Sequence, residues 1–249
     1  KIAAKKLDLE SNQIGIAATG IIGKALPMQT IESGLETLLE KKEQKQAHLV
    51  AKAILTTDLV EKVTYVEKKI GKKTITVAGI TKGSGMIAPN MATMLGFLVT
   101  NVSVSKEVLQ RCLINATNVS YNMISVDTDT STNDMLMCFA TGQYKINQAD
   151  KQELNAFQQA LNEASINLAK QIAQDGEGAK KLIQVDVQHA VSVKIAQQIA
   201  KQVINSPLVK TAIHGEDPNW GRIIMAIGKS DVDINLNKLS IKFGDLVIV

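Results

Sequence analysis

The sequence predicts an α+β fold in which helices and strands are intermixed in layers. Hydrophobic residues make up 45% of the 249 residues and charged residues 21%, which is ordinary usage for a globular protein with a substantial core. Apolar residues recur at helical spacing in several segments, while other segments are short runs of β-branched residues. Some predicted strands are joined as hairpins and others are separated by helices. This order of elements along the chain favours mixed α/β layers.

The N-terminal part begins with a helix-like pattern at Lys1 and continues with a short apolar run at 13–23. Because glycines bound this run, it predicts a buried strand that leads into a turn. The segment 27–42 places Ile31 and Leu35 at helical spacing after a proline, which predicts a helix.

The middle of the chain alternates between the two patterns. The predicted elements are, in order, a helix at 46–55, a hairpin at 62–85 that turns at Gly71, a buried strand at 95–104, a helix at 106–119 and a strand at 134–142. The hairpin prediction depends on two β-branched runs on either side of a glycine, which is the usual signature of such a turn.

The C-terminal part starts with the longest predicted helix, at 151–178, which two glycines bring to an end. After it we expect a strand at 181–188, a helix at 193–205, two short apolar segments at 208–215 and 220–228, and a hairpin-like segment at 231–249. The first residue is not methionine and the last residues resemble a strand, so we expect a longer protein at both ends.

Charge and composition exclude several classes of function. The formal net charge is +4 with dispersed lysines, and aromatic residues make up only 3%, so we expect no nucleic-acid surface. No apolar run is long enough to span a membrane and no signal peptide is recognisable, so we expect a cytoplasmic protein, or one of the mitochondrial matrix in a eukaryote.

The two cysteines, Cys112 and Cys138, lie in largely apolar surroundings without the spacing of a metal site. We expect buried free thiols in a reducing compartment. The histidines His48, His189 and His214 are far apart in the sequence, so we predict no metal site.

Four polar or glycine-rich loops, with a fifth candidate at 214–222, lie between the predicted elements, and loops commonly carry catalytic residues. They are AATGIIG (17–23), TKGSGMIAPNMAT (81–93), SVDTDTSTND (125–134), DGEGAKK (175–181) and HGEDPNWGR (214–222). The third is expected to form a hydrogen-bonded turn network around Asp127, Asp129 and Asp134.

The pair Ala92-Thr93 raises a specific chemical possibility. A threonine becomes an effective nucleophile when it is N-terminal, because its own α-amine then serves as the base, with a pKa near ~7.7–8.0. The hydroxyl of an internal threonine can produce this state by attacking the preceding carbonyl, after which water hydrolyses the ester. The alternative is that Ala92-Thr93 merely begins a structural element after a tight turn.

Taken together, the loops resemble the glutamate N-acetyltransferase family, also called ornithine acetyltransferases, of arginine biosynthesis. The resemblance covers essentially the whole chain and keeps the motif order. The motifs that carry it are ATGIIG, AILTTD, KGSGMIAPNMATML, SVDTDTSTND, DGEGAKK and SPLVKTAIHGEDPNWGRI.

This resemblance implies an αββα-type layered architecture and self-cleavage between Ala92 and Thr93. The two products, a portion from 1–92 and a portion from 93–249, would each be fragmentary at the outer end and would stay associated, generally as an α2β2 assembly. Thr93 would carry the acetyl group from N-acetylornithine to glutamate. No metal or organic cofactor is implied, and acetyl-coenzyme A is a further candidate donor.

Individual site residues follow from the same resemblance, position by position. Thr19 and Gly20 match the oxyanion-hole pair of the family. The residues that match substrate contacts are Thr56, Lys82, Thr93 and Glu177. The sequence departs from the family at Thr128, where glycine is usual, and it lacks the tail that contributes an asparagine and a hydroxyl residue to the pocket.

Two other functions compete with acetyl transfer. A self-processing amidase or aminopeptidase of related architecture would use water in place of glutamate as the acceptor. A non-catalytic binding protein would keep the loops as turns and leave the Ala92-Thr93 bond intact.

Overall fold

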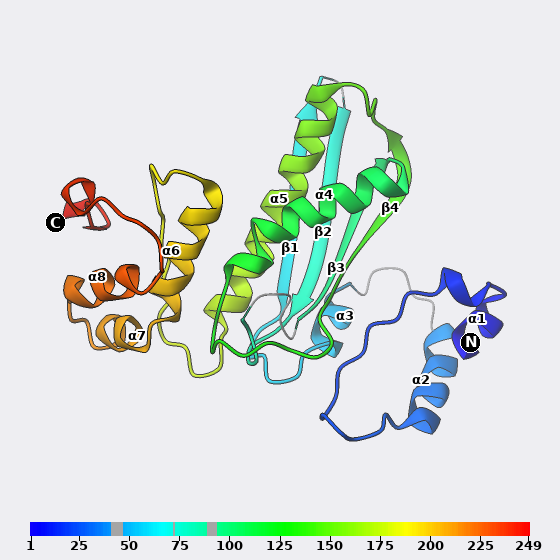
Figure 1. The fold of residues 1–249 in the computed structure, drawn as a ribbon. Coiled ribbons are helices and arrows are strands. Elements are labelled where there is room, and N and C mark those ends of the chain that lie inside the picture. Colours follow the sequence, from blue (N-terminus) through cyan, green and yellow to red (C-terminus); the bar gives the residue numbers. More distant parts are fainter. Residues whose placement is uncertain (41–46, 72, 89–93) are drawn as a thin grey trace.

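The computed structural model describes residues 1–40, 47–71, 73–88 and 94–249, and it has the predicted mixed α+β architecture. Its centre is a four-stranded sheet in the order β1-β2-β3-β4 (Figure 1). The strands are β1 (Lys62–Ile70), β2 (Lys73–Lys82), β3 (Leu95–Ser103) and β4 (Met135–Lys145). The first three run antiparallel in succession, whereas β3 and β4 are parallel. The predicted hairpin at 62–85 and the strands at 95–104 and 134–142 are therefore confirmed.

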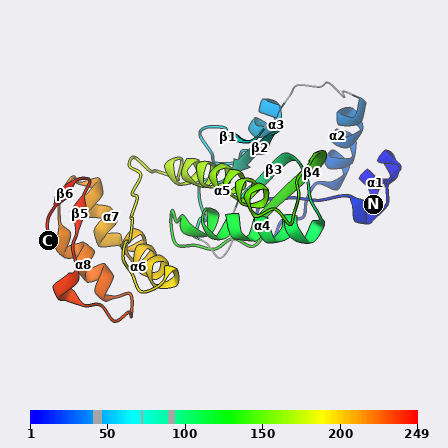
Figure 2. The ribbon, with the colours of Figure 1, turned by 90° about the horizontal axis from the view of Figure 1, so that it is seen from above.

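Two helices cover one face of this sheet, α4 (Lys106–Asn118) and α5 (Lys151–Gln174), as the view from above shows (Figure 2). The short helix η2 (Tyr121–Met123) follows α4 in the crossover from β3 to β4. Side-chain caps fix where the longer helices begin: Ser105 accepts a hydrogen bond from the amide of Val108, and Asp150 accepts one from Gln152.

The main core lies between the sheet and these helices. On β2 and β3, Val77 and Leu98 are completely buried, and on α5 Phe157, Leu161 and Leu168 are as well. Burial of each such side chain contributes roughly 1.5–3 kcal/mol. This shared core holds the ends of the strands at fixed positions.

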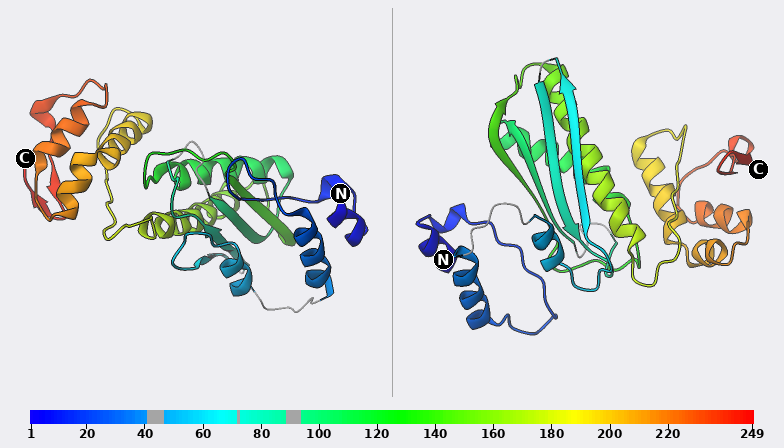
Figure 3. Two further views of the ribbon diagram at one scale, coloured as in Figure 1. Left: turned by 90° about the horizontal axis from the view of Figure 1, so that it is seen from below. Right: turned by 180° about the vertical axis from the view of Figure 1, so that it is seen from behind.

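The opposite face of the sheet, which the right-hand view of Figure 3 looks onto, carries a row of apolar side chains. Tyr65 pairs with Ala78, Ala78 with Val99, and Val99 with Phe139, so these four side chains form a row across the strands. Tyr65, Val99 and Phe139 are exposed. The described residues thus supply one helix layer and one sheet layer of the layered fold that the sequence predicts.

The N-terminal segment contains α1 (Ile2–Leu7), η1 (Ser11–Gln13), α2 (Met28–Glu40) and α3 (Ala47–Ala53). The prediction of a strand at 13–23 is wrong, because residues 14–20 have no regular secondary structure. The segment approaches β4 through side chains instead of a backbone ladder: Gly15 lies against the sulfur of Met137, and the side-chain amide of Asn133 donates to the carbonyl of Ala18.

The C-terminal part has a second small core, which joins Ile199, Val203, Val209, Ala226, Ile227 and Ile241. Its elements are α6 (Val193–Asn205), α7 (Pro207–His214), α8 (Trp220–Gly228), η3 (Leu236–Lys238), β5 (Lys242–Phe243) and β6 (Leu246–Val247). The predicted strand at 181–188 is absent, because Val185 and Val187 pack on this core as irregular chain. The expected hairpin at 231–249 is reduced to the two-residue strands β5 and β6.

Both cysteines are free thiols, as predicted. Cys112 is buried as expected, whereas Cys138 is only half-buried, so the prediction of a buried thiol is correct for Cys112 alone. Burial still raises the pKa of the Cys138 thiol to about 12. Within the described residues, no helix has the length and apolar character needed to cross a membrane.

Candidate active site

The strand ends at one edge of the sheet bring the predicted functional loops together. Lys82 at the end of β2 pairs with Leu95 at the start of β3, and Leu95 pairs with Met135 at the start of β4. The segments that meet around this edge are 56–59, 83–88, 125–134 and 175–178. Ala92 and Thr93 lie outside the described residues, directly before Met94 in the sequence.

The 125–134 loop forms the hydrogen-bonded network that its sequence predicts. Asp127 accepts hydrogen bonds from the amides of Met86 at 2.6 Å and Ile87 at 2.9 Å, and a third from the amide of Asp129. Thr128 has a positive φ of 71°, a left-handed conformation in which glycine is favoured. The departure from the family pattern therefore falls at a position where the backbone itself favours glycine.

Asp134 fixes the residue that follows Thr93. One oxygen of its carboxylate accepts a hydrogen bond from the amide of Met94 at 2.9 Å, and the carbonyl of Met94 accepts one from Met135. The other oxygen is buried and has no hydrogen-bond partner among the described residues. Burial raises the pKa of Asp134 above the usual 3.8, while the nearby ammonium of Lys82 acts in the opposite direction.

The neighbouring residue Asn133 contacts the predicted oxyanion-hole segment. Its side-chain amide donates to the carbonyl of Ala18, which precedes Thr19 and Gly20 in the chain. Thr19 is half-buried and Gly20 is exposed. Two consecutive residues of one loop thus hold the chain next to Thr19 and the chain next to Thr93.

Lys82 and Thr56, both predicted substrate contacts, touch each other. The Lys82 side chain is 2% exposed, and its Nζ donates to the Thr56 hydroxyl at 3.3 Å. Burial lowers the pKa of Lys82 below the ordinary 10.5 of a lysine, although the carboxylates of Asp58 and Asp134 partly oppose this effect. A buried cation of this kind is suited to hold a carboxylate that enters the site.

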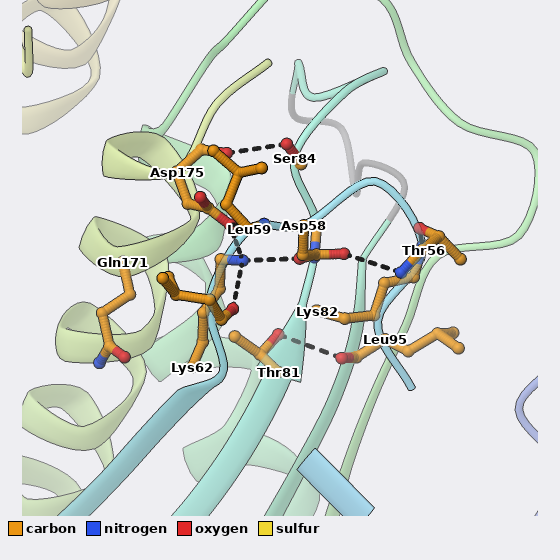
Figure 4. Close-up of polar contacts among 12 residues, drawn as sticks. Thr56, Asp58, Leu59, Lys62, Thr81, Lys82, Ser84, Leu95, Gln171 and Asp175 are labelled. Atoms are coloured by element: carbon orange, nitrogen blue, oxygen red, sulfur yellow. Dashed lines mark hydrogen bonds and ion pairs between the residues drawn. The ribbon is translucent and has the colours of Figure 1, made fainter. Parts of the chain in front are cut away.

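Behind Lys82 lies a buried charged cluster that the sequence did not reveal. Lys62, at the start of β1, is completely buried, and its Nζ lies 2.6 Å from Asp58 and 2.5 Å from Asp175 (Figure 4). The signal was weak, because a lysine at the start of a strand is usually exposed. We call Asp58, Lys62 and Asp175 the buried triad.

Both carboxylates of the buried triad also hold backbone groups. Asp58 accepts hydrogen bonds from the amides of Gly83 at 2.7 Å and Thr56 at 3.1 Å. Burial alone would raise the pKa of Asp58, but the hydrogen bonds to its carboxylate and the charge of Lys62 outweigh this effect and place the pKa below 3.8. Asp175 accepts from the amide of Leu59 at 3.0 Å.

Glu177 reaches the same edge from the C-terminal end of α5. The carbonyl of Asp175 accepts from the hydroxyl of Ser84 at 2.8 Å, and the amide of Glu177 donates to the carbonyl of Ser84 at 3.0 Å. These bonds place the Glu177 carboxylate against Gly85, where an added Cβ would lie 2.6 Å from its Cδ. Glu177 is exposed, so its charge is open to solvent and to a ligand.

In the part of the chain that the structure describes, the arrangement combines a buried cation, Lys82, an exposed anion, Glu177, and the chain next to the two predicted oxyanion-hole residues. Thr56 and Lys82 are in direct contact, Glu177 is held through Ser84, and the chain before Thr19 is held through Asn133. Among the described residues, no group of three or more His, Cys, Asp and Glu side chains is placed to hold a metal ion.

Known proteins resemble this chain over its full length. The ArgJ family model matches residues 1–249. An "Arginine biosynthesis bifunctional protein ArgJ" from Bacillus cereus is 48% identical over 250 residues, which are 100% of this chain and 61% of that protein. A protein with the same name from Oceanobacillus iheyensis is 47% identical over 251 residues, again 100% of this chain and 61% of that protein.

A solved structure agrees with the sequence comparisons. The crystal structure of "Arginine biosynthesis bifunctional protein argJ" from Bacillus halodurans is 45% identical, with a TM-score of 0.58 over 61% of this chain and 72% of that chain. This chain spans about 61% of the length of the curated relatives described above. The family match, these identities and the shared fold establish that the chain belongs to the ArgJ family.

Proposed function

We propose that this protein transfers an acetyl group from N-acetylornithine to glutamate in arginine biosynthesis, with Thr93 as the nucleophile after cleavage of the Ala92-Thr93 bond. The observation that carries the proposal is the pair Asn133 and Asp134. Asp134 binds the amide directly after Thr93, and Asn133 binds the carbonyl directly before Thr19. The names of the relatives, which place those proteins in arginine biosynthesis, support the pathway.

Self-cleavage needs no other reactant than water. The Oγ of Thr93 attacks the carbonyl carbon of Ala92 and loses its proton, the C–N bond breaks, and the amine of Thr93 takes up a proton. Water then hydrolyses the resulting ester, which leaves a carboxylate on Ala92 and restores the hydroxyl of Thr93. The new α-amine lies on the same residue as the hydroxyl and serves as its base.

Acetyl transfer then proceeds in two steps through an ester on Thr93. The hydroxyl attacks the acetyl carbon of N-acetylornithine, and ornithine leaves with the proton that the α-amine has taken. Glutamate binds next, and its amine attacks the ester and restores the free threonine. An acyl-enzyme that alternates between two substrates gives ping-pong kinetics.

Each of the other predicted residues has a role that suits its position. The Thr19-Gly20 segment supplies hydrogen-bond donors to the oxyanion, where the loss of one donor costs about 2.7–4 kcal/mol. Lys82 binds a substrate carboxylate, assisted by Thr56, with which it is already in contact. Glu177 offers its exposed carboxylate to an ammonium group.

The proposal extends to the assembly and to the choice of donor. The chain segments 1–92 and 93–249 remain associated after cleavage, as parts of an α2β2 assembly. Acetyl-coenzyme A is the candidate second donor, and the word "bifunctional" in the names of the relatives supports testing it.

Product analysis of the full-length protein tests the function. N-acetylornithine and glutamate are supplied together, and N-acetylglutamate and ornithine are measured against free acetate. We expect N-acetylglutamate to form in step with ornithine, and we expect none with the Thr93→Ala variant. Release of acetate without N-acetylglutamate would identify a hydrolase, and the absence of both products would favour a binding protein. A parallel reaction with acetyl-coenzyme A tests the second donor.

A further inference from the structure

The buried triad joins the segments that carry all three described substrate-contact candidates. Lys62 and Asp58 have completely buried side chains, and that of Asp175 is 5% exposed. Asp58 holds the backbone of Thr56 and of Gly83, the residue after Lys82. The main chain of Asp175 holds Ser84, which in turn binds the amide of Glu177.

Lys62 and Lys82 both act on the same carboxylate, that of Asp58. Lys62 is bonded to Asp58 at 2.6 Å, whereas Lys82 donates to the Thr56 hydroxyl and experiences Asp58 only as a nearby charge. Asp58 is thus already paired with the ammonium of Lys62, and the Nζ of Lys82 donates its hydrogen bond to Thr56. Figure 4 shows the two lysines on opposite sides of Asp58.

We propose that Lys62 is a positioning residue of the active site, which keeps Asp58 occupied and thereby holds Lys82 beside Thr56, ready for a substrate carboxylate. This role rests on the proposed function, in which Lys82 binds substrate. Lys62 itself touches neither substrate nor the reacting atoms, and it acts through Asp58 and Asp175.

Stability alone is a poor explanation for such a cluster. The desolvation of buried charges often offsets their attraction, and apolar replacements of a whole buried pair are frequently neutral or stabilising. The charged side chains of the triad hold four backbone groups in fixed positions, which apolar side chains could not do. These groups are the amides of Thr56, Leu59 and Gly83 and the carbonyl of Val60.

The kinetic test uses the full-length protein and two variants, Lys62→Met and the double variant Lys62→Met/Asp175→Asn. Lys62→Met alone leaves two buried carboxylates without their cation, which could unfold the protein. The double variant removes one charge of each sign and leaves only the carboxylate of Asp58, so it keeps the test valid if the single variant does not fold. The control is Lys68→Met, which removes a lysine of the same strand whose ion pair with Glu163 at 2.5 Å is partly exposed.

In the folded variants of Lys62 we expect the KM for glutamate to rise about tenfold or more, because the charge-assisted contact of Lys82 with the substrate is weakened. We expect kcat to change by less than about twofold, since binding is lost equally from the ground state and the transition state. The Lys68→Met control should retain both constants. An unchanged KM, or a fall in kcat without a rise in KM, would overturn the proposal.

A crystal structure of the double variant tests the geometry without any activity. We expect the Nζ of Lys82 to leave Thr56 and form an ion pair with Asp58. A Lys82 that stays on the Thr56 hydroxyl would overturn the proposal. Failure of wild-type protein to transfer acetyl would instead count against the proposed function, while this structural result would still decide the role of Lys62.

Discussion

The carboxylate of Glu177 lies directly against the α-carbon of Gly85, although the two residues are on different segments. A Cβ at position 85 would come within 2.7 Å of both carboxylate oxygens. The glycine therefore leaves the space that Glu177 occupies beside the strand edge.

The variant Gly85→Ala should displace Glu177 and weaken substrate binding. The colliding atoms are the far end of an exposed side chain, so the displacement should cost little stability, within about 1 kcal/mol. We expect KM to rise about threefold to tenfold, the range for a weakened polar contact. The matched control is Gly34→Ala in α2, where an added Cβ meets nothing within 4 Å. Steady-state kinetics and thermal unfolding of both variants test this, and an unaltered KM in Gly85→Ala would contradict it.

Asp134 should control the rate of self-cleavage through the amide of Met94. Asp134→Ala removes the acceptor of that amide, and hydrogen bonds to charged groups contribute about 1.5–3 kcal/mol, so cleavage should slow by up to about 10- to 100-fold. Asp134→Asn keeps an acceptor oxygen and should be affected less. The time course of fragment appearance after synthesis provides the measurement, with the exposed Asp129→Ala as control. Equal rates in Asp134→Ala and Asp129→Ala would refute this role.

Thr128 carries backbone strain that glycine would remove. Its φ of 71° costs a β-branched residue about 1–2 kcal/mol of stability, a cost that glycine does not have. Glycine in turn costs about 0.5–1 kcal/mol, because its unfolded chain has more conformational freedom to lose. We expect Thr128→Gly to stabilise the protein by about 0.5–1 kcal/mol. Thr132→Gly, in the same loop without a positive φ, should destabilise it by a similar amount. Denaturant unfolding distinguishes the two, and destabilisation by both substitutions would contradict the explanation.

Because the pKa of Lys82 is lowered, alkaline pH should weaken substrate binding while the same group makes the folded protein more stable. Burial lowers the pKa of Lys82 below the ordinary 10.5, so Lys82 loses its proton at a lower pH than an exposed lysine does. With the proton it loses its charge and its attraction for a carboxylate. KM should therefore rise with pH through this lowered pKa. Between the lowered pKa and 10.5 the unfolded state binds more protons, so this group makes stability increase with pH. The pH dependence of KM and of the free energy of unfolding is measured for the wild type and for Lys82→Met, and the difference between the two proteins isolates both effects. Identical pH profiles in the two proteins would contradict the assignment.

The sequence predicted the elements that carry strong periodic patterns and missed those that depend on distant partners. The hairpin about Gly71 and the long helix before Asp175 were both recognisable, because each has a clear pattern and end signal. The segment 181–188 has the composition of a strand, but the ladder it needs is missing and its valines pack on a helical core.

The same contrast applies to the site. Lys82 and Thr56 were identified through motifs, and the structure brings them into contact. Lys62 was missed, because its partner Asp175 lies 113 positions away and only the fold shows that both are buried. The roles of all the predicted site residues stay predictions, as does the division of the chain at Ala92-Thr93; these residues are Thr19, Gly20, Thr56, Lys82, Thr93 and Glu177.

Intact-mass spectrometry of freshly purified full-length protein, before and after addition of N-acetylornithine alone, tests the central claim most directly. The account predicts two fragments in wild type, the second beginning at Thr93 and gaining one acetyl group, and a single uncleaved species in Thr93→Ala. A wild-type protein that remains one uncleaved chain while it still transfers acetyl, or that carries the acetyl group on another residue, would contradict it.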